Sequence, residues 1–386
     1  MKISVNIQPL LHSDKSGIGF YEAELIKAMG RLDNENEYVL DFFSLKNSDD
    51  KIKTAEKYAG KNIRLNPCKW FSATVYQLLW AVIPIPYRLF FREKSDVSHF
   101  YNYYVPPFAR GKKAAVIYDA VIKDFPETVR FKTKLMLRLT LKSSIRRADR
   151  IITISQFSKQ QIIKHFGVPA ERIDIVPCGV NFDVFRPDYD NKLISDAKIK
   201  YGINGDYILY LGTLEPRKNI ERIIEAYSVM LSRTEAPPLL VLAGGKGWLY
   251  ESIFEKVKTL GLEDKVVFTG YVPDGDVPLL MKGAMVFCFP SIYEGFGMPP
   301  LEAMACGTPV LTSNSTALPE VVGDAAIQAD PYSVEEIAEG MIKLTESSEL
   351  RRQLSEKGLE QCRRFTWEKS AAEMLDVYKR LVNEKN

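Results

Sequence analysis

Short apolar runs alternate with longer amphipathic segments along the whole chain. Such runs, bounded by turn residues and followed by apolar positions at helical spacing, indicate strands that are buried on both faces of a parallel sheet. The expected strands span residues 2–10, 38–44, 63–65, 114–118, 150–155, 173–177, 207–211, 239–243, 266–268 and 284–289. Strands and helices that alternate in this way predict an α/β fold with two parallel-sheet domains.

The chain divides near residue 185. Its 386 residues exceed the length of a typical domain with one core. Residues 181–206 are polar and show little periodicity beyond one short helix, so we interpret them as the interdomain connection. The expected domains therefore span residues 1–185 and 186–367.

The stretch PSIYEGFGMPPLEAMACGTPV, residues 290–310, carries the strongest chemical signal. It predicts a loop with Gly295 and Gly297, then a helix with prolines in its first turn and a glycine after its end. The N–H groups at such a helix start favour an anion. Glu294 and Glu302 flank the turn, and their carboxylates suit the hydroxyls of a ribose or a sugar better than a phosphate. A capped core helix with two solvated glutamates explains the same pattern.

Two further strand–loop–helix junctions carry residues that suit phosphate groups. Gly17 and Gly19 precede a helical pattern, but the third glycine of the dinucleotide-binding motif is absent, so a phosphate loop and a plain tight turn both remain open. In the second half, Thr213, Arg217 and Lys218 lie between an apolar run and a helix. Paired basic side chains beside helix N–H groups indicate a diphosphate clamp, and solvated surface charge is the alternative.

Polar residues also stand at two strand ends in the first half. Tyr118 is the last residue of the run at residues 114–118, and Asp119 follows it. Ser155 is the last residue of the run at residues 150–155. Open α/β sheets bind ligands beyond the carboxyl ends of their strands. We therefore expect the Asp119 carboxylate near a ligand.

Composition excludes disorder and shows one asymmetry. Apolar residues make up 46% of the chain and charged residues 26%, as in ordinary soluble globular proteins. Residues 1–185 hold 29 basic and 19 acidic side chains, whereas the remainder holds 23 and 30. A basic first half indicates an anionic surface or substrate, and attraction between the two halves explains the asymmetry equally well.

Residues 69–94 are dense in aromatic side chains, with basic residues at the edges of the stretch. The most apolar window, 75–91, contains two prolines and is too short to span a membrane. This pattern suits a membrane interface, but we favour burial of most of the aromatic side chains. A strongly basic helix is expected over residues 131–150. Candidates for its apolar stripe are Leu135, Leu139, Leu141 and Ile145.

No metal site is expected from the sequence. The five cysteines are scattered and odd in number, which favours a reducing cytoplasm over a disulfide framework or a zinc site. Cys288 and Cys306 lie in apolar surroundings and are expected in the core. Turn chemistry explains the Asp-x-Asp pairs at residues 188–190 and 274–276. Because no signal peptide is recognised either, we expect a cytoplasmic protein that requires no metal.

Taken in order along the chain, these motifs resemble those of the retaining glycosyltransferases of family 4. The likeness spans residues 3–370 and is carried most specifically by YLGTLEPRKNIERIIEAY, FPSIYEGFGMPPLEAMACGTPV and LPEVVGDAA. Within the family, the chain most resembles the bacterial mannosyltransferase-B-like branch, which builds O-antigen, capsule and other surface polysaccharides. The resemblance implies the GT-B fold, in which two Rossmann-like domains face each other across a cleft. The last helix, here residues 368–386, would cross back to the first domain.

The resemblance also implies a donor site. Arg217 and Lys218 would neutralise the donor diphosphate as it leaves, Glu302 would accept hydrogen bonds from the ribose, and Glu294 would hold hydroxyls of the donor sugar. The main chain near Val272 would bracket the base. The other expected donor-binding residues are Gly17, Gly19, Thr213, Gly295, Phe296, Gly297 and Met298.

On the acceptor side, the resemblance places Asp119 near the reacting centre, with Tyr118 and Ser155 beside it. The family usually has His-Asp where this chain has Tyr118-Asp119, and we expect this change to shift selectivity for the donor sugar. Reduced activity is the alternative. The expected catalytic residues are Asp119, Arg217, Lys218 and Glu294.

The implied reaction is retaining transfer of a hexose from a nucleotide sugar to a lipid-linked or oligosaccharide acceptor. The leaving phosphate oxygen would take the acceptor's proton on the same face, so no protein nucleophile is expected. GDP-mannose is the favoured donor. A UDP-hexose or dTDP-rhamnose donor and an inactive scaffold or binding subunit are the alternatives. No nucleic acid and no cofactor beyond the nucleotide-sugar co-substrate are expected, and peripheral contact with the inner face of the cytoplasmic membrane is a further interpretation.

Overall fold

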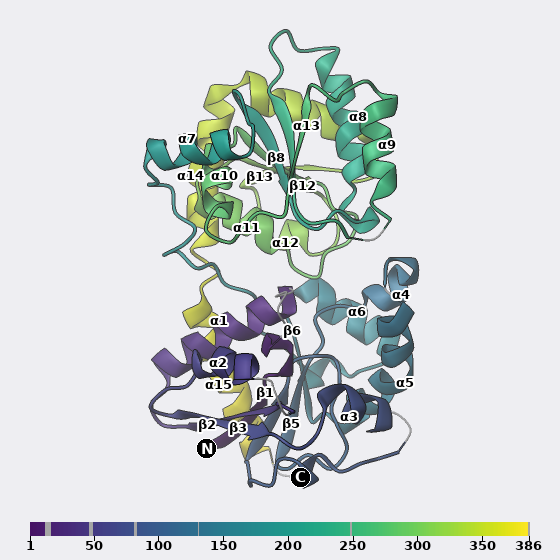
Figure 1. Cartoon of the computed structure of the whole chain (residues 1–386), viewed down its shortest axis with the longest axis vertical. Coiled ribbons are helices and arrows are strands. Elements are labelled where there is room, and N and C mark those ends of the chain that lie inside the picture. The colour runs from purple at the N-terminus through teal and green to yellow at the C-terminus, as the bar shows by residue number, and fades with distance from the viewer. Residues whose placement is uncertain (12–16, 46–48, 81–82, 130, 248, 385–386) are drawn as a thin grey trace. The chain divides into compact units, whose positions relative to one another are not determined.

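The computed structural model describes residues 1–11, 17–45, 49–80, 83–129, 131–247 and 249–384. It divides into unit 1, which comprises Met1–Gly179 with Trp367–Asn386, and unit 2, which comprises Val180–Thr366. Each unit is a parallel sheet with helices on both faces (Figure 1). The predicted architecture of two parallel-sheet α/β domains is confirmed. The predicted boundary after residue 185 falls inside the start of unit 2.

Unit 1 has a seven-stranded sheet in the order β3-β2-β1-β4-β5-β6-β7. Its strands are β1 Lys2–Asn6, β2 Glu37–Phe43, β3 Ile63–Cys68, β4 Val97–Phe100, β5 Lys112–Val116, β6 Arg150–Thr153 and β7 Ile173–Ile175. The first strand is shorter than the predicted 2–10, because a 3-10 turn at Gln8–Leu11 follows it and Pro9 has no N–H for a ladder. The strand order reverses between β1 and β4, which is the topological switch point of this sheet.

The helices of unit 1 include the last helix of the chain. They are α1 Gly17–Leu32, α2 Asp49–Glu56, α3 Ala73–Trp80, α4 Val121–Asp124, α5 Phe131–Arg147, α6 Gln156–Phe166 and α15 Trp367–Asn383. Helix α15 packs along α1, where Trp367 contacts the ring of Tyr21, and the Tyr378 hydroxyl lies 2.7 Å from Nδ1 of His99 on β4. These contacts attach the C-terminal helix to the unit that the start of the chain forms.

Unit 2 has a six-stranded sheet in the order β10-β9-β8-β11-β12-β13, with its switch point between β8 and β11. Its strands are β8 Tyr207–Leu211, β9 Leu239–Ala243, β10 Val266–Gly270, β11 Val286–Phe289, β12 Val310–Ser313 and β13 Ala326–Ala329. Its helices are α7 Asn191–Lys200, α8 Ile220–Leu231, α9 Glu251–Thr259, α10 Val277–Gly283, α11 Met298–Ala305, α12 Leu318–Val322, α13 Val334–Glu346 and α14 Ser348–Cys362. All strand pairs are parallel, and the central strands β8 and β11 are almost fully buried.

Residues 181–206 are not a free connection, as the sequence had indicated, but part of unit 2. Helix α7 packs against α10, and Asp276 beside α10 accepts hydrogen bonds at 2.6 Å from both Lys200 and Tyr201. Asp190 caps α7 by accepting the N–H of Lys192. Residues 274–276 form a turn, as interpreted from the sequence, whereas residues 188–190 form none and Asp190 instead caps a helix.

All five cysteines are buried and free, and Cys288 and Cys306 lie in the core of unit 2 as predicted. In the described part of the chain, no three side chains of histidine, cysteine, aspartate or glutamate are grouped closely enough to hold a metal ion. Across the same residues, no helix combines the length and the apolar character needed to cross a membrane.

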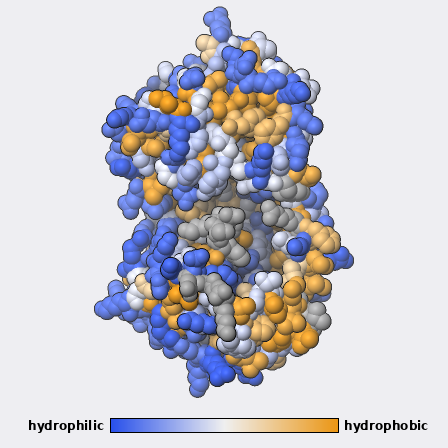
Figure 2. All heavy atoms as spheres, viewed as in Figure 1, coloured by the Kyte–Doolittle hydropathy of each residue, from blue (hydrophilic) through white to orange (hydrophobic). Residues whose placement is uncertain are grey.

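Helix α5 does not bury the stripe that the sequence had indicated. Leu141 and Ile145 are buried, but Leu135 and Leu139 are 46% and 53% exposed. Leu139 and Leu141 are two positions apart, which is about 200° around a helix, so the four residues point to opposite sides. Figure 2 shows apolar side chains on the surface of unit 1 where Figure 1 places α3 and α5.

The aromatic stretch at residues 69–94 is mostly buried, as we had favoured. Tyr76, Trp80, Tyr87 and Phe91 are at most 4% exposed and belong to one core cluster of unit 1. Trp70 is the exception, because 61% of it is exposed. The stretch therefore contributes to both the core and the surface of unit 1.

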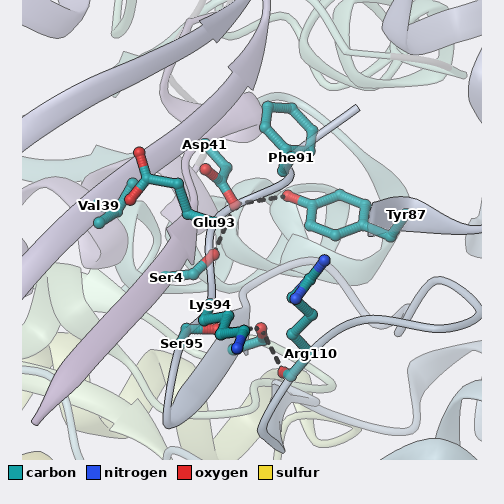
Figure 3. Close-up of a pocket in the computed structure, with 10 residues that line it drawn as sticks. Ser4, Val39, Asp41, Tyr87, Phe91, Glu93, Lys94, Ser95 and Arg110 are labelled. Atoms are coloured by element: carbon teal, nitrogen blue, oxygen red, sulfur yellow. Dashed lines mark hydrogen bonds between the residues drawn. The ribbon is translucent and has the colours of Figure 1, made fainter. Parts of the chain in front are cut away.

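Two of the buried carboxyl groups of unit 1, those of Asp41 and Glu22, lie in very different environments. Asp41 on β2 accepts hydrogen bonds from Ser4 (2.5 Å), Asn66 (2.7 Å) and Tyr87 (3.4 Å), and Figure 3 shows it between Ser4 and Tyr87. Burial raises the pKa of Asp41 to about 7 in spite of these donors. Glu22 on α1 is fully buried, and neither carboxyl oxygen has a hydrogen-bond partner among the described residues. Burial therefore raises the pKa of Glu22 well above its usual range.

Replacing Glu22 with methionine is expected to raise the free energy of unfolding by ~1–3 kcal/mol at pH 7, the cost of a buried unsatisfied polar group. The gain should grow as pH rises, because a carboxyl group whose pKa is raised in the folded state loses its contribution above its unfolded pKa. Urea unfolding of the full chain at pH 5 and pH 8 measures both effects. The control is Asp41→Leu, which leaves three donors unpaired and should destabilise by about 2 kcal/mol or more. If the Glu22→Met variant were less stable than the unaltered chain, the interpretation of Glu22 as a destabilising, unsatisfied carboxyl group would be wrong.

Candidate functional site

The candidate site lies at the switch point of the sheet in unit 2. The loops that follow β8 and β11 leave neighbouring strands at their carboxyl ends and lead into helices on the two faces of the sheet. This is where open α/β sheets bind their ligands. The loop after β8 carries Arg217 and Lys218, and the loop after β11 carries Glu294 and the glycines.

The backbone holds the Arg217–Lys218 turn firmly against the second loop. Pro216–Lys218 form a 3-10 turn that ends at Asn219, whose φ of 65° is left-handed. The buried Asn219 side chain donates hydrogen bonds to the carbonyls of Pro290 (2.9 Å) and Pro331 (2.6 Å). The Arg217 carbonyl accepts the N–H of Ile292 at 3.0 Å. The two basic side chains thus start from a rigid backbone.

Glu294 is the centre of a buried charge cluster. Its carboxylate accepts hydrogen bonds from Nζ of Lys218 (2.5 Å), Nη1 of Arg217 (3.3 Å) and Oγ of Ser291 (2.7 Å). Arg217 also donates to the Tyr293 carbonyl and to Glu215, each at 2.7 Å. The cluster places two cations and two carboxylates within one hydrogen-bond network.

The pKa values of the cluster follow from burial and from these pairs. Burial alone would raise the pKa of Glu294, but the adjacent Lys218 and Arg217 outweigh it and hold the pKa below its usual range. Burial lowers the pKa of Lys218, partly offset by the attraction of Glu294. Nζ of Lys218 also lies 4.9 Å from the centroid of the Phe289 ring at the end of β11. The Glu294 carboxylate thus stays ionised within the buried cluster.

The glycine loop leads directly into α11. Gly297 has a φ of 123°, and a Cβ atom there would lie 2.6 Å from Cδ2 of Leu318, so both its conformation and its surroundings require glycine. Met298 is the first residue of α11 and is half-buried, whereas Phe296 is buried against Phe365. The N–H groups at the start of α11 favour a negative charge at this loop.

Glu302 lies in α11, one turn beyond its start, and is half-buried. Burial raises its pKa to about 8, and the negative charge of Asp274 adds to this effect. Asp274 belongs to the loop after β10, which also carries the buried Val272. The Glu302 carboxyl is therefore largely protonated at pH 7, in contrast to Glu294.

Other predicted donor-site residues take ordinary backbone positions. Thr213 is exposed in the loop after β8, and Gly244, after β9, approaches that loop so closely that a Cβ atom would lie 1.9 Å from the Gly212 carbonyl oxygen. In unit 1, Gly17 and Gly19 form the first turn of α1 rather than a loop before it. Neither has a positive φ.

The predicted acceptor-side residues lie near the carboxyl ends of β5 and β6 in unit 1. Tyr118 is 5% exposed, its ring contacts those of Tyr21 and Tyr103, and its hydroxyl has no partner among the described residues. Asp119 accepts hydrogen bonds from the Tyr103 hydroxyl and the Val121 N–H, both at 3.2 Å. Ser155 is buried and caps α6 by accepting the Ser158 N–H.

Within unit 2, then, the structure joins Arg217, Lys218 and Glu294 in one network and places Glu302 further along α11. The sequence reasoning missed the residues that support this network, namely Glu215, Asn219 and Ser291. Glu215 and Ser291 lie two and three positions from the residues that they contact, Arg217 and Glu294. Asn219 is adjacent to Lys218, but its contacts with Pro290 and Pro331 are 71 and 112 positions apart in the chain. No local pattern signals such contacts.

Two protein families match the chain. The family described as Glycosyltransferase Family 4 matches residues 16–184, and that described as Glycosyl transferases group 1 matches residues 195–361. An O-antigen chain mannosyltransferase B from Escherichia coli is 31% identical over 396 residues, covering 99% of this chain and 100% of that protein. The chain belongs to glycosyltransferase family 4. Its predicted likeness to the mannosyltransferase-B branch is confirmed.

This family 4 glycosyltransferase is also similar in sequence to a second mannosyltransferase and in structure to two solved proteins. The serotype-specific mannosyltransferase WbdA of Escherichia coli is 36% identical over 240 residues, which cover 61% of this chain and 29% of WbdA. A sucrose-phosphate synthase from Thermosynechococcus elongatus has a TM-score of 0.76 at 19% identity over 98% of both chains. Anabaena HepE in complex with UDP and glucose has a TM-score of 0.74 at 19% identity over 98% of this chain and 100% of HepE. At such identity, the structural likeness shows the fold alone.

Proposed function

We propose that this glycosyltransferase transfers mannose from GDP-mannose, with retention, to a lipid-linked or oligosaccharide acceptor in surface polysaccharide synthesis. The names of the Escherichia coli relatives support mannosyl transfer and, for the first, an O-antigen product. The reaction would take place at the inner face of the cytoplasmic membrane. A UDP-hexose or dTDP-rhamnose donor is the alternative. The complex of HepE with UDP and glucose is the reason to include UDP in the test.

The observation that carries this proposal is the network of Arg217, Lys218 and Glu294 at the switch point of unit 2. A donor diphosphate at the start of α11 would share the two cations with Glu294 and receive the N–H groups of the helix. Glu294 would then turn its remaining acceptor capacity to hydroxyls of the donor sugar. Glu302 would accept hydrogen bonds from the ribose.

Catalysis would consist of positioning and of stabilising the charge that develops on the leaving diphosphate. Preorganised cations in a buried site act on that charge without reorganisation. The leaving phosphate oxygen would take the proton of the acceptor hydroxyl on the same face, which retains the anomeric configuration. With two cations and a helix terminus supplying positive charge, the proposal requires no metal. Asp119 would act on the acceptor side, with Tyr118 and Ser155 beside it.

A thermal-shift panel with GDP, UDP, dTDP and CDP, and then the matching nucleotide sugars, tests the proposed donor. A ligand at 100 times its Kd adds about 2.7 kcal/mol to stability, so the correct base should stand out. Stabilisation by GDP and GDP-mannose alone is the expected result. Stabilisation by UDP or dTDP would overturn the proposed donor and keep the transferase. If no nucleotide stabilises the chain and no donor is consumed, the inactive scaffold replaces this proposal.

A further inference from the structure

One face of unit 1 exposes large apolar side chains. We call it the α3–α5 face. We define it by six exposed apolar side chains: Trp70 (61% exposed), Leu78 (60%), Leu89 (51%), Phe131 (78%), Leu135 (46%) and Leu139 (53%). Figure 2 shows apolar residues over the region where Figure 1 places α3 and α5. Contiguous exposed apolar area of this kind marks an interaction surface rather than ordinary scatter.

Internal contacts connect the elements that carry these side chains. The Arg147 guanidinium near the end of α5 lies 5.6 Å from the ring centroid of Trp80 at the end of α3. Trp70 stacks on Phe90 with 5.0 Å between ring centroids, which joins the segment before α3 to the segment after it. The inward residues of α3 and α5 belong to the same core cluster. The outward residues therefore sit on a packed, fixed support.

The charged side chains of the segments that carry these apolar residues are all basic. Helix α5 carries six basic residues and no acidic one, and no acidic residue occurs between Glu56 and Glu93. Lys132, Arg138 and Lys142 are exposed beside the leucines of α5. Their long stems can lie along apolar material while the charged ends reach a polar boundary. An apolar stripe flanked by lysine and arginine is typical of a helix that lies in a membrane interface.

We propose that the α3–α5 face docks unit 1 on an anionic lipid bilayer. The complementary charge favours this occupant, because the cores of protein interfaces are depleted in lysine, whereas anionic lipid headgroups attract lysine and arginine alike. Trp70 supplies an aromatic ring of the kind enriched at the membrane–water boundary. The inference deepens the proposed function and rests on it for its purpose, since a lipid-linked acceptor is presented at such a surface.

Sedimentation of the full chain with vesicles tests the face. The vesicles are phosphatidylcholine alone or phosphatidylcholine with 30% phosphatidylglycerol. Binding is expected to the anionic vesicles and to weaken strongly in high salt. Replacing Arg138 and Lys142 with glutamine should lower the affinity by roughly 30-fold, at about 1 kcal/mol per basic residue. Replacing Leu135 and Leu139 with serine should lower it by at least about tenfold, because each leucine would contribute buried apolar area.

Matched variants in unit 2 serve as controls. Lys343→Gln with Lys357→Gln removes the same charge from exposed positions, and Ile199→Ser removes an apolar side chain that is 72% exposed. These controls should bind vesicles like the unaltered chain. Equal weakening by the controls, or equal binding to neutral vesicles, would overturn the proposal. A dimer in solution that the leucine variant dissociates would also overturn it, because the face would then hold a second copy.

The nucleotide panel separates the two proposals. If the unaltered chain does not bind vesicles but is stabilised by a nucleotide, the docking face is overturned and the proposed transferase function stands. Vesicle binding with no response to any nucleotide would overturn the proposed function and leave the docking face. The α3–α5 variants should keep the nucleotide response of the unaltered chain, since all four substitutions lie in unit 1 and the network belongs to unit 2.

Discussion

Replacing Arg217 or Lys218 with alanine is expected to lower kcat by roughly 10²–10³-fold while the donor KM changes much less. The two cations would meet a diphosphate in the ground state, but the charge on the leaving oxygen grows only as the glycosidic bond breaks. An interaction that strengthens in the transition state appears in kcat rather than in KM. Steady-state kinetics of transfer, or of donor hydrolysis, measure the two constants separately.

The network around Glu294 complicates these variants and also supplies their control. Removing Lys218 leaves the buried Glu294 carboxylate with one cation fewer, so stability should fall as well. The double variant Lys218→Met with Glu294→Gln removes the charge pair together and should recover stability but not kcat. Arg233→Ala breaks an exposed pair with Glu335 in the same unit and should leave both constants unchanged. A loss confined to KM in the Arg217 and Lys218 variants would contradict charge stabilisation.

The parts of the site that could be predicted from the sequence are those whose residues lie close together in the chain. The loop residues of the site stand at fixed distances from their strands, so the motif that contains Glu294, Gly295 and Gly297 predicts a strand end, a turn and a helix start together. The parallel strands were predictable for the same reason, since an apolar run buried on both faces leaves a continuous signal. The strand ends in turn brought the Arg217 loop and the Glu294 loop to one edge of the sheet.

Features that depend on distant contacts were not predictable. Whether Leu135 lies in the core or on the surface depends on which side of α5 meets the sheet, and a helix with leucines on two sides leaves that undecided. The support that Asn219 gives to Pro290 and Pro331 requires three segments to meet. The raised pKa of Glu302 depends on burial and on Asp274, which is 28 positions earlier in the chain. Such environments exist only once the fold has formed.

Nucleotide binding is expected to release a proton from Glu302. The pKa of about 8 keeps this carboxyl largely neutral at pH 7 before binding, whereas ribose hydroxyls would donate to the ionised form and lower the pKa. Linkage then requires affinity to rise with pH, by roughly tenfold between pH 6.5 and 8, and to level off above the free pKa. Calorimetry in two buffers of different ionisation enthalpy counts the protons released and gives the Kd at each pH.

The variant Glu302→Gln has the same shape and cannot titrate, so it serves as the reference for protons that the nucleotide itself exchanges. Its affinity should vary with pH only as the nucleotide's own ionisation requires, and its proton release should be smaller than that of the unaltered chain. Its stability should also exceed that of the unaltered chain at pH 8, because a carboxyl group with a raised folded pKa stabilises the fold below its unfolded pKa and loses that contribution as pH rises through about 8. If the two proteins instead released equal numbers of protons while binding the same nucleotide, Glu302 would not contact the ribose. The stability difference would still report the buried carboxyl, so the two outcomes separate a binding role for Glu302 from a purely structural one.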